Sequence, residues 1–359
     1  MISISSHCAF SQGCIAIRNI AGFGQFAQLG YNQSDKKWMM NLSNRYYMAV
    51  EPFKDSQKLD LNPDESKRSI NYNYTFNLSM IRLLEKGWSI GFDLPIYNNT
   101  LVRRQEHLSG DRHSTHAFGL GDIRVTVYKW ILKQEDTRKW NVQAGLGLKL
   151  PTGDFRSEDY FYINQIDKTA KQSAPVDPGM QLGDGGTGIT IELNGYYLLS
   201  SMVSFYGNMF YLINPRDQNG VSTLKGQPAG GSLLNGAYDE AATLTVDSVP
   251  DNYTVRVGGN FTYKSFVATA GLRYEGVPKY DLVGENHGLR RPGQVGSVEL
   301  GVQYKMKTGF FYVFVPIAYN RWLQQSVPDE TQSQLQGTYQ TTIGRIPTST
   351  FIIGYSVLF

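Results

Sequence analysis

Apolar and polar residues alternate along most of this chain, in runs of about ten residues. The clearest run covers residues 69–84, where Ile70, Tyr72 and Tyr74 alternate with Asn71 and Asn73. A helix would mix these two sets around its circumference, whereas a strand separates them onto opposite faces. The run therefore predicts a long β-strand with one apolar face and one polar face.

The same alternation predicts about twelve strands, with ends accurate to about two to four residues. Strands of this length exceed the roughly five to six residues usual in globular proteins and fit a tilted membrane crossing. The predicted strands are 37–52, 69–84, 88–98, 118–132, 140–151, 186–200, 202–213, 252–263, 265–277, 295–306, 309–321 and 346–359.

The connections between these strands are alternately short and long. Bacterial outer-membrane barrels have short turns on the periplasmic rim and long loops on the outer rim, and an even strand count puts both termini in the periplasm. The short turns are 85–87, 134–139, 201, 264 and 307–308, and the long connections are 53–68, 99–117, 152–185, 214–251, 278–294 and 322–345.

A soluble β-sandwich would also alternate, so further features must separate the two folds. The chain ends at Phe359 on the same face as Phe351 and Tyr355, which resembles the signal read by the barrel-assembly machinery. Aromatic residues also gather near strand ends, where the interfacial girdles of membrane barrels belong. These girdle candidates are Trp38, Tyr46, Trp88, Tyr97, Tyr197, Tyr211, Tyr253, Tyr263, Tyr274, Tyr304 and Tyr319. We predict an all-β fold, a transmembrane antiparallel up-and-down barrel.

Composition agrees with this fold. Charged residues make up 18% of the chain, less than in a typical soluble domain, and no stretch of about 18 uncharged apolar residues predicts a membrane helix. The mean hydropathy of −0.33 is mild, as expected where every second residue faces a polar lumen. A net charge of +3 with scattered basic residues gives no reason to expect a nucleic-acid partner.

The segment before the first strand has separate interpretations. Residues 1–11 resemble the end of a signal peptide, with Ala9-Phe10-Ser11 as the cleavage site. Residues 12–35 are predicted to be a periplasmic segment or a plug inside the lumen, and 36–359 to be the barrel. The two cysteines, Cys8 and Cys14, precede every predicted strand, so no disulfide framework can hold the barrel together.

Charged residues on the polar faces are candidates for the lumen. About twelve strands lie between filled eight-stranded barrels and open sixteen-stranded porins, so a narrow or gated pore is a hypothesis. The charges would either brace the wall through salt bridges or form a selectivity ladder along the pore. The lumen candidates are Arg45, Asp93, Asp122, Arg124, Lys149, Glu192, Arg256, Arg273, Glu275, Glu299 and Lys305.

The long connections hold the remaining chemistry. No predicted strand carries a histidine, no G-x-S-x-G nucleophile motif occurs, and the histidine spacing fits no firm metal motif. We therefore expect no enzyme activity, no metal and no cofactor. Arginines near the outer rim are candidates to pair with lipopolysaccharide phosphates. The histidines are His107, His113, His116 and His287, and the arginines are Arg103, Arg104, Arg112, Arg290 and Arg291.

Three segments together resemble a known family. They are 119–122 (GLGD), 145–154 (GLGLKLPTGD) and 182–188 (LGDGGTG), each next to a predicted strand. They are similar to segments of the outer-membrane transporter family associated with the MetA pathway of phenol degradation. The likeness covers about residues 118–200, and in pattern it extends to Phe359. It implies a barrel that passes small, aromatic or hydrophobic molecules, and it carries over no binding residues.

The sequence thus predicts an outer-membrane channel or transporter for small solutes with a narrow polar lumen. The expected partners are outer-membrane lipid and lipopolysaccharide, the barrel-assembly machinery during insertion, and a small-molecule solute. The alternative is a structural or partner-binding barrel without transport, and an outer-membrane hydrolase is less favoured.

Overall fold

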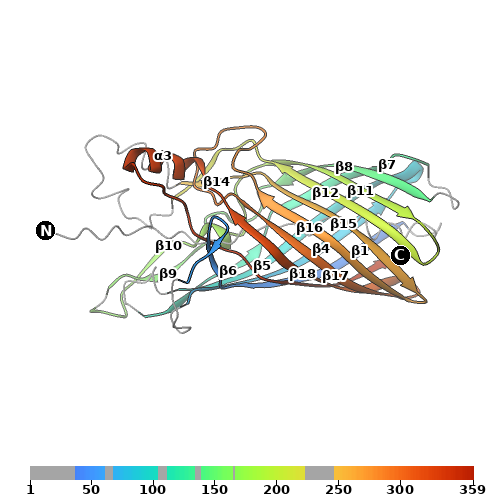
Figure 1. Cartoon of the computed structure of the whole chain (residues 1–359), viewed down its shortest axis with the longest axis horizontal. Coiled ribbons are helices and arrows are strands. Elements are labelled where there is room, and N and C mark those ends of the chain that lie inside the picture. The colour runs from blue at the N-terminus through green and yellow to red at the C-terminus, as the bar shows by residue number, and fades with distance from the viewer. Residues whose placement is uncertain (1–36, 61–67, 104–110, 134–138, 165, 223–245) are drawn as a thin grey trace.

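The computed structural model describes residues 37–60, 68–103, 111–133, 139–164, 166–222 and 246–359, and these residues form a closed antiparallel β-barrel (Figure 1). The strands pair in chain order, apart from two that share one partner, and the first strand pairs with the last to close the barrel. The strands are β1 (Trp38–Ala49), β4 (Ile70–Leu83), β5 (Trp88–Arg103), β6 (His113–Leu120), β7 (Ile123–Trp130), β8 (Trp140–Leu150), β11 (Gly188–Leu198), β12 (Val203–Ile213), β15 (Asn252–Tyr263), β16 (Phe266–Val277), β17 (Gly293–Lys305), β18 (Gly309–Leu323) and β20 (Thr350–Leu358).

β6 and β7 together occupy one position in the wall, because both pair with the same side of β5. β5 pairs with β6 along Ile96 to Arg103 and with β7 along Trp88 to Asp93. The wall therefore counts twelve strands, which confirms the predicted all-β transmembrane barrel.

The burial pattern runs opposite to that of a soluble sandwich. On β8, the side chain of Leu146 is 63% exposed on the outside, whereas that of Gln143 is 4% exposed on the inside. A sandwich buries its apolar faces, but here the apolar faces point outward and the buried faces carry Asn, Ser, Thr and charged residues. An apolar outside and a polar inside is the arrangement of a membrane barrel.

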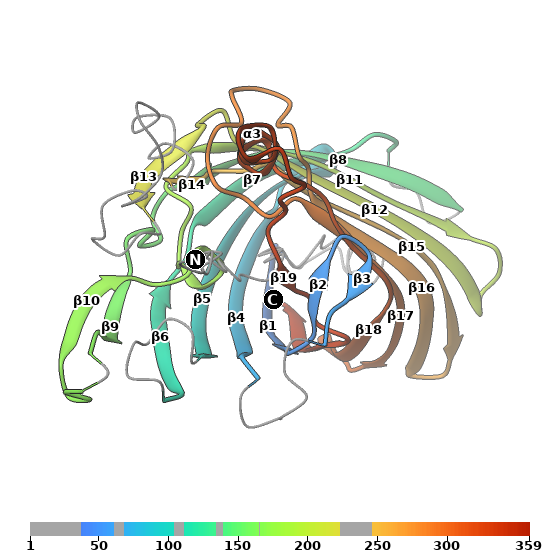
Figure 2. The ribbon, with the colours of Figure 1, turned by 60° about the vertical axis from the view of Figure 1, so that its left-hand side comes forward.

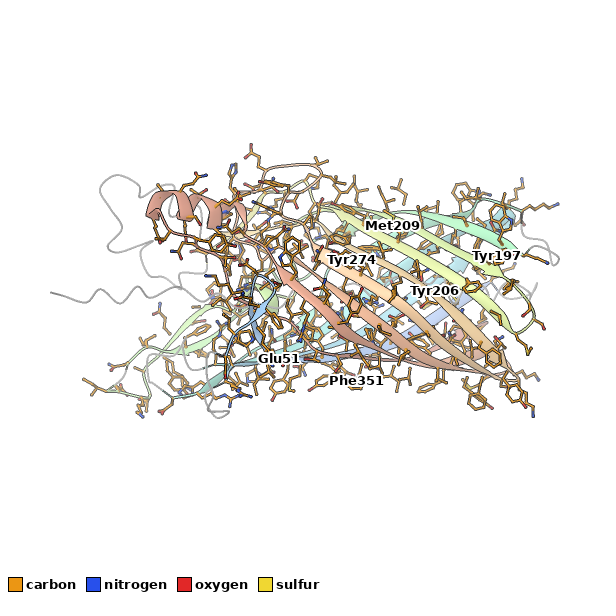
Figure 3. All side chains as sticks on the ribbon, viewed as in Figure 1. Glu51, Tyr197, Tyr206, Met209, Tyr274 and Phe351 are labelled. Carbon is orange, nitrogen blue, oxygen red and sulfur yellow. The ribbon has the colours of Figure 1, made fainter. Side chains whose placement is uncertain are left out.

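Exposed aromatic side chains line the rim that carries the short turns, which we call the turn rim. This rim also holds the C-terminus, and the side chains of the wall are drawn in Figure 3. Such rings anchor a barrel at the membrane–water interface. The exposed rings of the turn rim are Trp38, Trp88, Trp140, Tyr197, Tyr263, Phe266, Tyr304 and Phe359.

One predicted girdle residue faces the other way. Tyr97 is buried, because it has the same parity along β5 as Asp93 and Pro95, whose side chains are also buried. Its assignment to the outer girdle was wrong. Tyr97 instead packs with Leu101 and Met180 inside the barrel.

The opposite rim, which we call the loop rim, contains more strand residues than the sequence predicted. Residues 99–117 were expected to be a loop, but β5 extends to Arg103 and β6 begins at His113, so the expectation that no strand carries a histidine was wrong. The added strand residues are stabilised because Leu101 and Ala117 form a buried cluster with residues of the connection from β8 to β11, residues 151–187.

Short elements fill the connections of the loop rim (Figure 2). Helix α3 begins with a capping box between Ser326 and Asp329 and ends at Gly337 in the left-handed conformation. No helix in the described ranges is long and apolar enough to cross a membrane. The elements are β2 (Pro52–Lys54), β3 (Gln57–Lys58), β9 (Glu158–Tyr162), β10 (Lys171–Pro175), η3 (Pro178–Met180), β13 (Gln218–Ser222), β14 (Val246–Ser248), α3 (Val327–Gln336) and β19 (Gly344–Arg345), and the turn rim holds η2 (Glu85–Gly87).

The predicted signal-peptide remnant at 1–11 and the segment or plug at 12–35 lie outside the described residues. The barrel wall starts at Trp38, whose backbone N–H donates to the carbonyl of Phe359 at 2.9 Å.

The outward face predicts a position-dependent cost for charge. Leu146→Arg places a guanidinium on the lipid face and should lower the unfolding free energy by about 2–4 kcal/mol in lipid. The matched variant Leu282→Arg changes a residue that is 66% exposed in a loop-rim connection and should shift stability by less than about 0.5 kcal/mol. Urea unfolding in liposomes measures both, and equal effects would contradict a lipid-facing surface.

Candidate functional site

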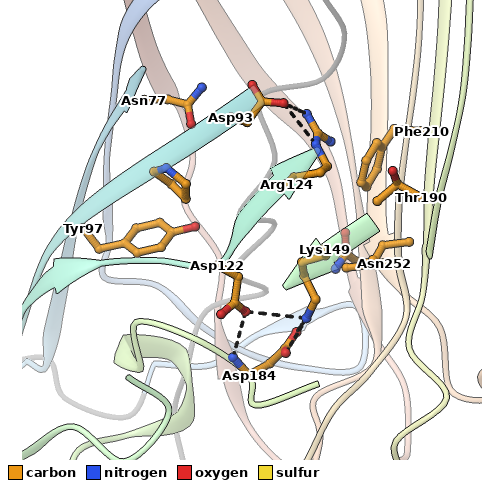
Figure 4. A pocket seen from close by; sticks show the side chains of 12 residues that line it. Asn77, Asp93, Tyr97, Asp122, Arg124, Lys149, Asp184, Thr190, Phe210 and Asn252 are labelled. Carbon is orange, nitrogen blue, oxygen red and sulfur yellow. Dashed lines mark hydrogen bonds and ion pairs between the residues drawn. The ribbon is translucent and has the colours of Figure 1, made fainter. Parts of the chain in front are cut away.

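Charged side chains inside the barrel form three clusters. In the first, Arg124 of β7 pairs with Asp93 of β5 (Figure 4) and also with Glu192 of β11. Its Nη2 donates to Asp93 Oδ2 at 2.7 Å, and its Nη1 lies 3.3 Å from Glu192 Oε1. Tyr128 donates to Glu192 at 3.1 Å, and the Arg124 guanidinium lies 5.1 Å from the centre of the Phe210 ring. The cluster thus joins three strands of one wall.

The second cluster is a chain of alternating charges on the other side of the barrel. Arg256 Nε donates to Glu299 at 3.1 Å, and Arg273 Nη1 lies 3.6 Å from the same carboxylate. Arg273 Nε also donates to Glu275 at 2.7 Å, and Arg45 Nη2 lies 3.8 Å from Glu275. These residues connect β15, β16, β17 and β1.

The third cluster ties a loop-rim connection to the wall. Lys149 of β8 forms an ion pair with Asp184 and lies 3.5 Å from Asp122 (Figure 4). Asp122 accepts the backbone N–H of Gly153 at 2.9 Å and that of Asp184 at 3.2 Å. The connection between β8 and β11 therefore folds back to the barrel interior at Asp184.

The three clusters bring together every lumen candidate except one. Lys305 is half-buried at the turn rim, and no ion pair joins it to another residue in the described ranges. Asp184 was missed, because it lies in a connection where no strand alternation assigns a side chain to a face. Its LGDGG surroundings were singled out only through the family resemblance.

A cavity lies beside the first and third clusters (Figure 4). Its empty volume is about 610 Å³, part of it open to solvent. Charged groups share its wall with Tyr97, Phe210 and Leu212, so a solute inside would meet both polar and apolar surface. The remaining lining residues are Asn77, Asp93, Pro95, Asp122, Arg124, Lys149, Asp184, Thr190 and Asn252.

A second cavity of about 790 Å³, also partly open to solvent, lies among the loop-rim connections. Asp184 and Asn252 line both cavities, so the two adjoin. Asp247 of β14 lines this outer cavity, and burial raises the pKa of its carboxyl, as does the nearby Asp177, whereas Arg291 lowers it. Together the cavities lead from the loop rim toward the middle of the barrel.

The short helix η3 is held in the mouth of the barrel by charge. Asp177 accepts from Arg103 at 3.0 Å and from the backbone N–H of Gly179 at 2.9 Å, and lies 3.3 Å from Arg291. Burial alone would raise the pKa of Asp177, but Arg291 and Arg103 hold it well below its usual range. Asn99 also donates to the carbonyl of Met180 at 3.0 Å.

These contacts bear on the arginines proposed for lipopolysaccharide. Arg103 and Arg291 are buried against Asp177, and Arg290 is buried against Asp281 at 2.6 Å. Their geometry does not fit the expected role at the outer surface, because opposite charges within the protein already bind them. Arg104 lies outside the described residues.

The first cluster predicts a large cost for removing its cation. Arg124→Met leaves two buried carboxylates without their shared partner and should lower the unfolding free energy by about 3–5 kcal/mol. Lys58→Met removes the cation of an exposed pair with Glu51 and should cost less than about 1 kcal/mol. Denaturant unfolding in detergent compares them, and a similar small loss in both would contradict a bracing role.

The ion pairs of Asp177 predict that the stability of the η3 segment depends on pH. Because its folded-state pKa is depressed, Asp177 contributes its full stabilisation above the unfolded value of about 3.9, and this is lost as pH falls toward the folded value. Between about pH 6 and pH 3, hydrogen-exchange protection of residues 176–182, corrected for intrinsic rates, should fall roughly five- to tenfold. Asp177→Asn should have low protection at both pH values, and a wild-type profile in this variant would contradict the assignment.

No family model and no curated protein matches the chain. Solved structures do align. An outer-membrane channel from Pseudomonas putida F1 covers 90% of this chain and 96% of its own, at 8% identity and a TM-score of 0.55. The translocator domain of the autotransporter NalP from Neisseria meningitidis covers 93% and 92% at 9% identity, with a TM-score of 0.47. The CymD monoaromatic hydrocarbon channel covers 98% of both chains at 8% identity, with a TM-score of 0.44.

The first alignment shows a shared fold and nothing finer at this identity. The closed wall, the apolar outside and the aromatic turn rim agree with it. The protein is a β-barrel of the bacterial outer membrane.

Proposed function

We propose that this barrel is a channel for small solutes, which pass from the outer cavity to the inner cavity and on through the barrel. The observation that carries the proposal is the junction of the two cavities at Asp184 and Asn252. A barrel that served only as a scaffold would have no need of a connected hollow leading inward from its loop rim. The fold shared with an outer-membrane channel is compatible with this function.

The lining of the inner cavity supports a class of solute. Tyr97, Phe210 and Leu212 offer an apolar wall, and Asp93 and Arg124 lie within the same lining. The charged lining residues are three carboxylates (Asp93, Asp122 and Asp184) and two cations (Arg124 and Lys149) that pair with them, so the lining has a formal net charge of only −1. We therefore propose small solutes that combine an aromatic or apolar part with a hydroxyl or similar polar group. The segments that resemble the phenol-associated family supply Asp122, Lys149 and Asp184, but no family model matches the chain, so the proposed solute class rests on the lining of the cavity.

The junction of the two cavities is a place where a bulky side chain should block the passage of solutes. Asn252→Trp places a large ring between the cavities and should reduce the swelling rate of liposomes by at least about fivefold, measured with small hydroxylated solutes that do not cross the lipid bilayer by themselves. Val255→Trp changes a lipid-facing residue of the same strand and should leave the rate within about twofold of wild type. Heat-dependent gel migration checks that both variants form barrels.

Two outcomes would contradict the proposal. One is a wild-type protein that gives neither liposome swelling with any solute nor conductance steps in planar bilayers, as a structural barrel would behave. The other is an Asn252→Trp barrel that folds and passes solutes at the wild-type rate, because flow would then bypass the junction.

A further inference from the structure

Two connections of the loop rim bring three metal-ligating side chains together. Asp217 lies just before β13 in the connection from β12 to β15, which also contains β14, and Glu285 and His287 lie in the connection from β16 to β17. One ligand atom from each residue lies within 4.8 Å of the other two. Neither connection contains a recognised metal motif, so only the fold creates this cluster.

The distances within the cluster suit a small cation. His287 Nδ1 lies 3.1 Å from Asp217 Oδ2 and 3.1 Å from Glu285 Oε2. Zinc binds nitrogen and carboxylate oxygen at about 2.0–2.2 Å, so ligand atoms on a tetrahedral edge lie roughly 3.4 Å apart. The three atoms need only small movements to surround an ion.

The charges also suit a divalent cation. Two carboxylates supply two negative charges, and a neutral imidazole adds none. The neighbouring Arg216 does not neutralise them, because its guanidinium donates to the carbonyls of Gln218, Gly185 and Asn219. Both carboxylates instead lie against the same ring nitrogen, His287 Nδ1.

Backbone contacts hold the two connections in register. The His287 N–H donates to Asp217 Oδ1 at 2.9 Å, and Ser248 and Leu289 are joined by a backbone hydrogen bond of 3.0 Å. A Cβ at Gly288 would lie 2.7 Å from Ser248 Cα, so the chains approach closely there. Hydrogen bonds of backbone N–H groups thus hold the segments that carry Asp217 and His287 next to each other.

We propose that Asp217, Glu285 and His287 form a binding site for a borderline divalent cation, of which Zn²⁺ is the best fit. The imidazole selects against Mg²⁺ and Ca²⁺, which prefer ligand sets made of oxygen. The Glu285 and His287 side chains are 73% and 56% exposed, so water completes the coordination. The ion cross-links two connections whose Asp247, Ser248 and Leu289 line the outer cavity. This site is independent of whether the barrel conducts.

Calorimetric titration of untagged, chelator-treated barrel in detergent with ZnCl₂ tests the site, and Co²⁺ absorption reports the ligands. We expect His287→Ala and Asp217→Asn each to lose one equivalent of Zn²⁺, or to bind it at least about tenfold more weakly. The control His116→Ala removes an exposed histidine of β6 and should bind as wild type does. Comparing equivalents between variants keeps the result clear of any Zn²⁺ bound by Cys8 and Cys14.

Three results would overturn the proposal. The first is a wild-type barrel that binds no Zn²⁺ in the micromolar range. The second is a folded His287→Ala barrel that binds the same number of equivalents with the same affinity as wild type. The third is a Ca²⁺ affinity equal to that for Zn²⁺, because it would exclude a role for the imidazole.

Discussion

The backbone of this protein must satisfy its own hydrogen bonds, because the hydrocarbon of a membrane offers no partners. A sheet can do so only if it has no free edge, and the pairing of β1 with β20 removes the edge that twelve strands would otherwise leave. The backbone link between Trp38 and Phe359 extends this seam to the turn rim. Every other feature of the molecule, including the outward apolar residues and the inward charges, depends on that closure.

Closure forces polar side chains into a confined interior, where unpaired charge is costly. Positive and negative side chains alternate across the strands of the wall, and their pairing offsets this cost. Arg124 forms ion pairs with two carboxylates on one side of the barrel, and Glu299 forms ion pairs with two arginines on the other side. Because the partners come from different strands, these pairs also fix the strands relative to one another. The same groups leave room for a cavity of mixed character at Phe210 and Leu212.

Buried ion pairs also stabilise the loop rim, outside the membrane. Its connections contain small strands, helices and buried ion pairs, such as those of Asp177 with Arg103 and Arg291. An arginine at a barrel mouth can face lipid phosphates or brace a loop, and in this protein Arg103, Arg290 and Arg291 brace loops. The ordered mouth gives the proposed solute path a defined outer cavity, and it places Asp217 next to His287.

The sequence by itself determined the wall. Side chains of a strand alternate with a period of two whatever the partner strand is, so the local pattern identified the strands and the facing of residues such as Arg124 and Glu192. The prediction was wrong at Tyr97, which was assigned to the outer aromatic girdle although it has the same parity along β5 as the inward-facing Asp93. It was also wrong at His113, because packing against the distant β8–β11 connection extends the strand.

Only the tertiary structure decided which charges meet. Strand register and the return of the β8–β11 connection set the contacts of Lys149 with Asp122 and Asp184, and these partners lie in separate parts of the sequence. The cluster of Asp217, Glu285 and His287 likewise depends on two connections that approach only after the barrel closes. The physical reason is range: alternation is a property of adjacent residues, whereas pairing between distant residues exists only once the chain has folded.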